Sequence, residues 1–128
     1  MDIVVHTNSP EPVYEQIVRQ IHEGVCSRRL EPGAPLPPVR QLAGDLDLNR
    51  NTVARAYKML EEQGVIQTAG RKGTFVRTNA SAEVTRLKSG HARRVAQRMV
   101  QTLLAEGLSR EEISGVFNDA LAGATKGG

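Results

Sequence analysis

The stretch that most constrains this chain runs from residue 36 to residue 76, where the spacing of apolar residues changes from helical to strand-like. In residues 38–46 apolar side chains recur at steps of three and four, which predicts a short helix with one buried face. After a turn at residues 47–49 the same spacing resumes, and two short β-prone runs follow at residues 65–68 and 74–77. The stretch therefore predicts helix, turn, helix and a two-stranded β-wing.

The second of these helices has both of its ends marked in the sequence. The Asn49 side chain can accept a backbone N–H, so the helix is expected to begin at Asn49 or Arg50. Gly64 suits the left-handed position that follows a last helical turn. The apolar residues between these ends predict the buried face, which consists of Val53, Ala56, Tyr57 and Leu60.

The opposite face of the same helix is polar and basic near its N-terminus. It carries Arg50, Asn51, Thr52 and Arg55. Arginine can donate to guanine O6 and N7, asparagine can pair with adenine N6 and N7, and threonine can bind a phosphate oxygen. Because the second helix of such a motif enters the major groove, we expect this face to bind double-stranded DNA.

A short basic loop at residues 69–73 joins the two β-prone runs. Gly70 and Gly73 permit a tight reversal, and Arg71 and Lys72 are expected at its tip. A basic hairpin tip beside a recognition helix can reach a neighbouring minor groove or its phosphates. The loop is thus predicted to add DNA contacts to those of the helix.

Several short motifs are spread over about half of the chain. They are Pro12-Val13-Tyr14-Glu15-Gln16-Ile17, Pro32-Gly33, Leu36-Pro37, Val39-Arg40-Gln41-Leu42-Ala43, Leu48-Asn49-Arg50-Asn51-Thr52-Val53, Ala56-Tyr57, Leu60, Gly64 and Gly73-Thr74-Phe75-Val76. In this combination residues 12–77 resemble the winged helix-turn-helix domain of the GntR family of bacterial transcriptional regulators. The resemblance implies DNA contacts from Arg40, Asn49, Arg50, Asn51, Thr52, Gly70 and Arg71.

Two positions depart from the pattern of this family. Its members often have Ser at position 38, where the side chain caps the helix, whereas this chain has Pro38. Proline suits a first turn but lacks a hydroxyl that could bond a phosphate. A second glycine is common at position 71, so Arg71 makes the wing more basic and leaves its turn type open.

The segment before the motif is expected to supply a supporting helix. Residues 3–5 form a short strand or an N-terminal arm, and a helix is expected from Pro10 or Pro12, capped by Ser9, to near Leu30. The apolar residues of this helix step by four along Val13, Ile17, Ile21 and Val25. Its arginines are interpreted as solvated surface in preference to a phosphate clamp; they are Arg19, Arg28 and Arg29.

His22 and Cys26 lie one helical turn apart and could form half of a metal site. No further ligand pair is recognisable, because His6 and His91 are isolated. We therefore predict no metal site and no cofactor. The single cysteine also excludes an intramolecular disulfide.

Small polar residues after the wing predict a boundary between a DNA-binding domain of residues 1–78 and a helical module of residues 79–128. The module is expected to hold a long helix from Ala82 or Glu83 to Glu106, and a second from Arg110 to about Leu121. Gly107 ends the first helix, and Ser109 with Glu112 forms a capping box for the second. The tail of residues 123–128 is expected to be disordered.

Both helices of this module carry apolar stripes. About 40 residues are too few to bury both stripes in a core of their own. A second copy of the chain is expected to cover them, through Val95, Met99, Val100, Leu103, Leu104, Val116, Phe117 and Leu121. The short two-helix module also resembles that of the YtrA-like subfamily, which implies dimerisation. The alternative is that the stripes pack onto the chain's own N-terminal domain.

Composition limits the functional classes to which the protein can belong. The chain has 128 residues and a net charge of +3, so bulk charge permits DNA binding without identifying it. Three percent aromatic residues, with no Trp, argue against a stacking surface for single-stranded nucleic acid. With no signal peptide and no long apolar run, we expect a cytoplasmic protein that does not contact membranes. The expected fold class is mainly α with a small β-wing (α+β).

The function expected from these features is sequence-specific regulation of transcription by a dimeric repressor bound to an inverted-repeat operator. One alternative is a winged-helix module that binds protein, which would require an uncharged or apolar exposed face in place of the basic one. Another is the N-terminal fragment of a fusion between a GntR head and an aminotransferase. The chain has no glycine-rich phosphate loop, nucleophile elbow or clustered catalytic residues, so no enzyme activity is expected. The identity of any small-molecule effector stays open. It is expected to bind between the DNA-binding domain and the C-terminal helices or between two subunits, since two helices cannot enclose a pocket by themselves.

Overall fold

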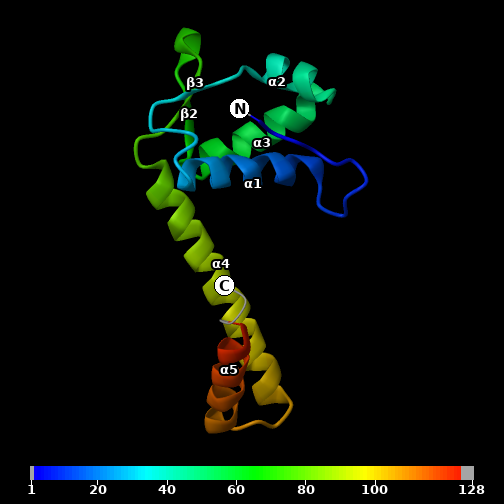
Figure 1. The fold of residues 1–128 in the computed structure, drawn as a ribbon, viewed down its shortest axis with the longest axis vertical. Helices are drawn as coiled ribbons and strands as arrows, with labels where there is room; N and C mark the ends of the chain where they lie inside the picture. The colour runs from blue at the N-terminus through cyan, green and yellow to red at the C-terminus, as the bar shows by residue number, and fades with distance from the viewer. Residues whose placement is uncertain (1, 125–128) are drawn as a thin grey trace. The chain divides into compact units, whose positions relative to one another are not determined.

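The structure, a computed structural model, describes residues 2–124 of the chain. Its elements in order are α1 Val13–Cys26, β1 Pro35–Leu36, α2 Val39–Leu46, α3 Arg50–Glu62, β2 Ile66–Thr68, the 3-10 helix η1 Gly70–Lys72, β3 Thr74–Val76, α4 Ala80–Ala105 and α5 Arg110–Ala124. In Figure 1, α1, α2 and α3 lie beside the β2–β3 hairpin, and the hairpin tip projects beyond them. The predicted fold class, mainly α with a small β-wing, is confirmed.

The chain forms two compact units, a first unit of residues 1–87 and a second unit of residues 88–128. The boundary expected at residues 78/79 lies earlier than this division. The cause is packing: Ala80 and Val84, near the start of α4, are 2% and 0% exposed and belong to the hydrophobic core of the first unit. For the same reason α4 begins at Ala80, before the predicted start at Ala82 or Glu83.

The two ends of α3 are those that the sequence predicts. Asn49 is the N-cap, and its Oδ1 accepts the Asn51 backbone N–H at 2.7 Å. At the other end Gly64 has a φ of 78°, and the Val65 N–H donates to the Leu60 carbonyl at 3.0 Å. The predicted apolar face is buried, and it packs between α1 and α2 as part of the core.

The α1 helix is shorter than predicted at both ends. It begins at Val13 instead of Pro10 or Pro12, and the Ser9 hydroxyl accepts the Glu11 N–H at 3.1 Å without capping the helix. It ends at Cys26 because the chain folds back after it, and the N–H of Leu30 donates to the carbonyl of Gly24 at 2.9 Å. The Leu30 side chain fills the space beside Gly24, where an added Cβ would lie 2.9 Å from Leu30 Cδ1.

The N-terminal segment is an arm that two glutamines of α1 hold in place. Gln20 Oε1 accepts the Val4 N–H at 3.0 Å, and Gln20 Nε2 donates to the Val4 carbonyl at 2.7 Å. Gln16, which is 1% exposed, forms the same pair of bonds with the backbone of His6. The side-chain amides thus replace a partner strand, and of the two forms that residues 3–5 were expected to take, the arm is confirmed.

A third strand was not predicted. The sheet has the antiparallel order β1-β3-β2, with Pro35 opposite Phe75 and Leu36 opposite Thr74. The sequence around Pro35 indicates a turn, and proline is tolerated in a sheet at an edge strand such as β1. Through this short strand the segment that leads into α2 is paired with the wing.

The second unit contains most of α4 and all of α5. Gly107 has a φ of 99°, and the capping box is present: Glu112 Oε1 accepts the Ser109 N–H at 2.9 Å, and Ser109 Oγ accepts the Glu112 N–H at 3.1 Å. The last helix continues beyond the expected end at Leu121 and includes Gly123, where a disordered tail was predicted. The rest of that predicted tail, residues 125–128, lies outside the described residues. No described helix is both long and apolar enough to cross a membrane.

Candidate nucleic-acid interface

The N-terminal turn of α3 presents the polar side chains expected to read DNA. Arg50 and Asn51 are exposed and Thr52 is half-buried. The Asn49 side-chain oxygen is engaged in the N-cap bond, so only its NH₂ group is left for a base or phosphate. From Arg50 to Lys58 the helix contains no acidic residue, and Arg50 and Arg55 therefore have no acidic residue three or four positions away on their own helix.

Arg55 is exposed one turn further along α3, but it already has an intramolecular neighbour. Its guanidinium carbon lies 3.9 Å from the centroid of the Tyr14 ring in the first turn of α1. A cation over an aromatic face is attracted to the ring and is held in one place. Sequence reasoning missed this role of Tyr14, because no local pattern relates residues so far apart in the chain.

Arg40 is exposed in the first turn of α2. The N-cap of this helix is Pro38, and the helix start has no side-chain cap bond, which agrees with the missing hydroxyl noted in the sequence. The preceding carbonyl, that of Pro37, accepts a hydrogen bond from the Tyr57 hydroxyl at 2.6 Å. Burial raises the pKa of Tyr57, so this hydroxyl stays protonated and donates at every physiological pH.

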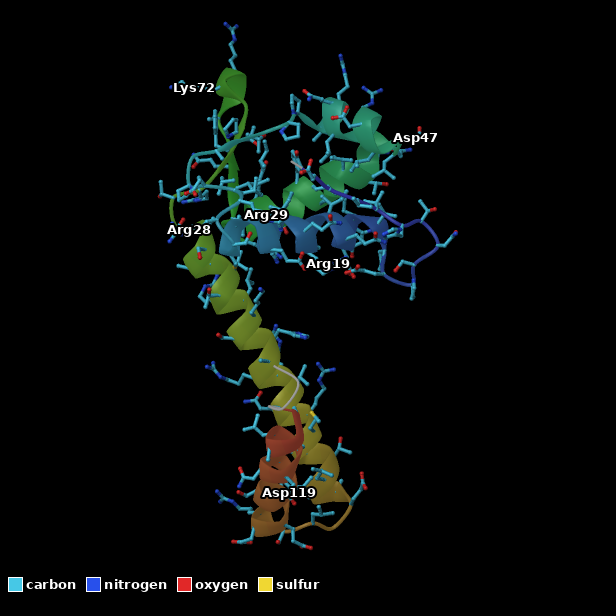
Figure 2. The ribbon with its side chains drawn as sticks, in the orientation of Figure 1. Arg19, Arg28, Arg29, Asp47, Lys72 and Asp119 are labelled. Atoms are coloured by element: carbon cyan, nitrogen blue, oxygen red, sulfur yellow. The ribbon has the colours of Figure 1, made fainter. Side chains whose placement is uncertain are left out.

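The wing tip is the 3-10 turn Gly70–Lys72, whereas the sequence predicts only a tight reversal without helical structure. The Ala69 N–H donates to the Gly73 carbonyl at 2.8 Å and closes the turn. Gly70 and Gly73 have φ values of 53° and 94°, whereas Arg71 is not among the residues with positive φ, so its side chain fits without strain. Figure 2 shows Lys72 at this tip, directed away from the body of the first unit.

The described residues contain no group of three or more His, Cys, Asp or Glu side chains that could hold a metal ion. His22, one of the two residues with metal-ligand spacing, has its Nε2 2.7 Å from Gln63 Oε1 at the end of α3. The other, Cys26, is exposed.

A capped helix with a basic N-terminal face, set in a helix-turn-helix and followed by a basic wing, defines a winged helix-turn-helix DNA-binding protein. Residues 13–76 match the family described as bacterial regulatory proteins of the gntR family, and the chain belongs to this family. It is accordingly a DNA-binding transcription regulator.

Two proteins named YtrA and one further regulator illustrate the similarity. The HTH-type transcriptional repressor YtrA of Bacillus subtilis is 36% identical over 102 residues, which cover 80% of this chain and 76% of that protein. A transcriptional regulator from Oenococcus oeni has a TM-score of 0.71 and 35% identity, covering 91% of this chain and 97% of its own. YtrA from Sulfolobus acidocaldarius, a GntR-family transcription factor, has a TM-score of 0.57 and 27% identity, covering 96% and 99%. These similarities confirm the YtrA-like resemblance.

Proposed function

We propose that the protein is a dimeric transcriptional repressor that acts in the cytoplasm on an inverted-repeat operator. The observation that carries the proposal is the exposed N-terminal face of α3, where a side-chain cap fixes the helix end and no acidic residue occurs between Arg50 and Lys58. The name of the Bacillus subtilis relative, a transcriptional repressor, supports the sign of regulation.

DNA recognition in this proposal combines three elements of the first unit. Arg50, Asn51 and Thr52 contact base edges and phosphates from α3, with Arg55 held beside them by Tyr14. Arg40 and the Asn49 NH₂ group bind phosphates where α2 and α3 begin. The wing contributes Gly70, Arg71 and Lys72, whose exposed backbone and charges suit a neighbouring groove.

Dimerisation is assigned to the second unit. Of the five large apolar side chains that are exposed among the described residues, four belong to it: Met99 at 49%, Leu104 at 41%, Val116 at 46% and Leu121 at 64%. The other residues of the proposed interface are partly covered; they are Val95, Val100, Leu103 and Phe117. Such a concentration of exposed apolar surface is typical of a protein–protein interface, and a two-fold dimer would present two recognition helices to an inverted repeat.

Selection from a random-sequence duplex library by the purified protein, followed by footprinting of the enriched duplex, tests the proposal. The expected product is an inverted repeat whose two half-sites lie on one face of the duplex and are protected together. Sequence-specific regulation would be contradicted if no sequence were enriched and if random competitor DNA abolished the binding. That result would favour a protein-binding role.

A further inference from the structure

The segment Pro35–Pro38 joins the wing to the helix-turn-helix. Three of its four residues are proline, which fixes φ and supplies no backbone N–H, so the segment is stiff. Its first half is β1, paired with β3 of the wing, and its Leu36 side chain is 5% exposed. Its last residue, Pro38, is the N-cap of α2. The start of α2 is thus attached through a stiff path to the wing.

The Tyr57 side chain attaches the same path to α3. The Tyr57 hydroxyl donates to the Pro37 carbonyl at 2.6 Å, and Tyr57 as a whole is 4% exposed. The bond lies one residue before the N-cap of a helix that has no side-chain cap of its own. The bond is made from the buried side of the reading helix, and it engages the carbonyl that immediately precedes the N-cap of α2, two residues before the turn that carries Arg40.

We propose that Tyr57 is a positioning residue for DNA recognition, and that through the Pro37 carbonyl it places Arg40 relative to the reading face of α3. This inference rests on the proposed function. Tyr57 does not touch DNA in this arrangement, because its ring is in the core and its hydroxyl is engaged inside the protein. In this proposal its contribution to DNA affinity passes through Arg40.

The Tyr57→Phe variant isolates the hydroxyl, since the ring and its packing stay. We expect affinity for the duplex enriched by the wild-type protein to fall about three- to tenfold, the factor that corresponds to one ordinary hydrogen bond. In an Arg40→Ala background the same substitution is expected to have less than about a twofold effect, because the residue it positions is gone. In the Tyr57→Phe protein the slope of log affinity against log salt should become less steep by the amount that about one phosphate contact contributes.

A purely structural role for Tyr57 predicts a different result. In that case Tyr57→Phe lowers the unfolding temperature without changing the affinity of the folded protein, or it lowers the affinity equally with and without Arg40. Ser27→Ala is the matched control, since it also removes a hydroxyl that donates to a carbonyl, that of Gly24 at 3.3 Å, at the end of α1 and outside the helix-turn-helix and wing. We expect wild-type affinity from this control.

A second variant covers the case in which Tyr57→Phe is unfolded at the assay temperature. Pro37→Gly keeps the acceptor carbonyl and the Tyr57 side chain but frees the backbone, and the same dependence on Arg40 is expected from it. Equal losses in both backgrounds, or wild-type affinity in a folded Tyr57→Phe protein, would overturn the inference and leave the proposed function intact. Failure of the wild-type protein to enrich any duplex would overturn both.

Discussion

The guanidinium of Arg55 lies over the Tyr14 ring, 3.9 Å from its centroid, so that a cation of the reading helix rests on the first turn of α1. An exposed arginine otherwise samples many rotamers, and ordering it on DNA costs conformational entropy. The stack restricts the side chain before DNA arrives. Tyr14 therefore connects the supporting helix to the surface proposed to bind DNA.

Replacing Tyr14 tests this connection. Tyr14→Leu is expected to weaken DNA binding about two- to fivefold, which corresponds to the roughly 0.5–1 kcal/mol of an exposed cation–π contact. Tyr14→Phe should keep the affinity, because the only bond its hydroxyl makes among the described side chains is to Glu15 on the surface. Fluorescence anisotropy of a labelled duplex measures both. A loss of equal size in an Arg55→Ala background would show that Tyr14 acts by another route.

Substitution of the exposed arginines separates base contacts from phosphate contacts. Arg40→Ala and Arg50→Ala are each expected to cost about 1–3 kcal/mol of operator binding, and Arg40→Ala should also make the salt slope less steep because Arg40 is assigned to a phosphate. Arg71→Ala should mainly lower the salt dependence. Arg29→Ala is the charge-matched control, because Arg29 is exposed after α1 and lies outside the proposed DNA-binding face. An Arg40→Ala, Arg50→Ala double variant with unchanged affinity would refute the assignment of this face to DNA.

A charge placed in the proposed dimer interface should separate the protomers. Leu121→Asp is expected to leave the monomer folded, since the side chain is 64% exposed there, and to abolish the dimer by burying an unpaired carboxylate in it. Val4→Asp is the control, with a similar 60% exposure in the first unit. Sedimentation at micromolar concentration should show a monomer for Leu121→Asp and a dimer for the wild type and the control. A monomeric wild type would disprove the role given to α5.

The left-handed turn at Asp47 predicts a stability difference between two neighbouring aspartates. Asp47 follows α2 with φ and ψ of 55° and 48°, a conformation that β-branched residues strongly disfavour. Asp47→Val should cost about 1–2 kcal/mol of unfolding free energy. Asp45→Val, at an exposed position inside α2, should cost a few tenths of that. Urea denaturation compares them, and equal losses would show that the turn carries no such strain.

The capping box of α5 gives the second unit a pH dependence of known sign. The Ser109 backbone N–H, and then its hydroxyl, hold the pKa of Glu112 below its usual value. A carboxylate with a lowered folded-state pKa stabilises the fold above its unfolded pKa, and that stability is lost as pH falls through the lowered pKa. Glu112→Gln has no titrating group there, so its unfolding temperature should lie below that of the wild type at neutral pH and approach it in acid. A constant difference at all pH values would contradict this account.

The helix ends and faces of the reading motif were predictable because their signals are local. A cap bond joins residues two apart, as in Asn49 and Asn51, and a buried face recurs every three or four residues, as in Val53, Ala56 and Leu60. The helical spacing of side chains is a property of the backbone itself. The polar face of α3 follows from the same periodicity, and the basic tip of the wing follows from the glycines between two β-prone runs, so these candidate residues could be named from the amino-acid order.

The contacts that complete the site join residues far apart in the chain. Pro35 pairs with Phe75, Arg55 lies on Tyr14, and the Tyr57 hydroxyl reaches the Pro37 carbonyl. None of these pairs has a fixed spacing, because each forms when two elements pack and bury their apolar faces against each other. For the same reason the first unit extends to residue 87, beyond the boundary that the sequence predicts at residues 78/79. The sequence predicts a linker at Ala80 and a helix start near Val84. Both side chains are instead buried in the core of the first unit, and this packing joins the beginning of α4 to that unit.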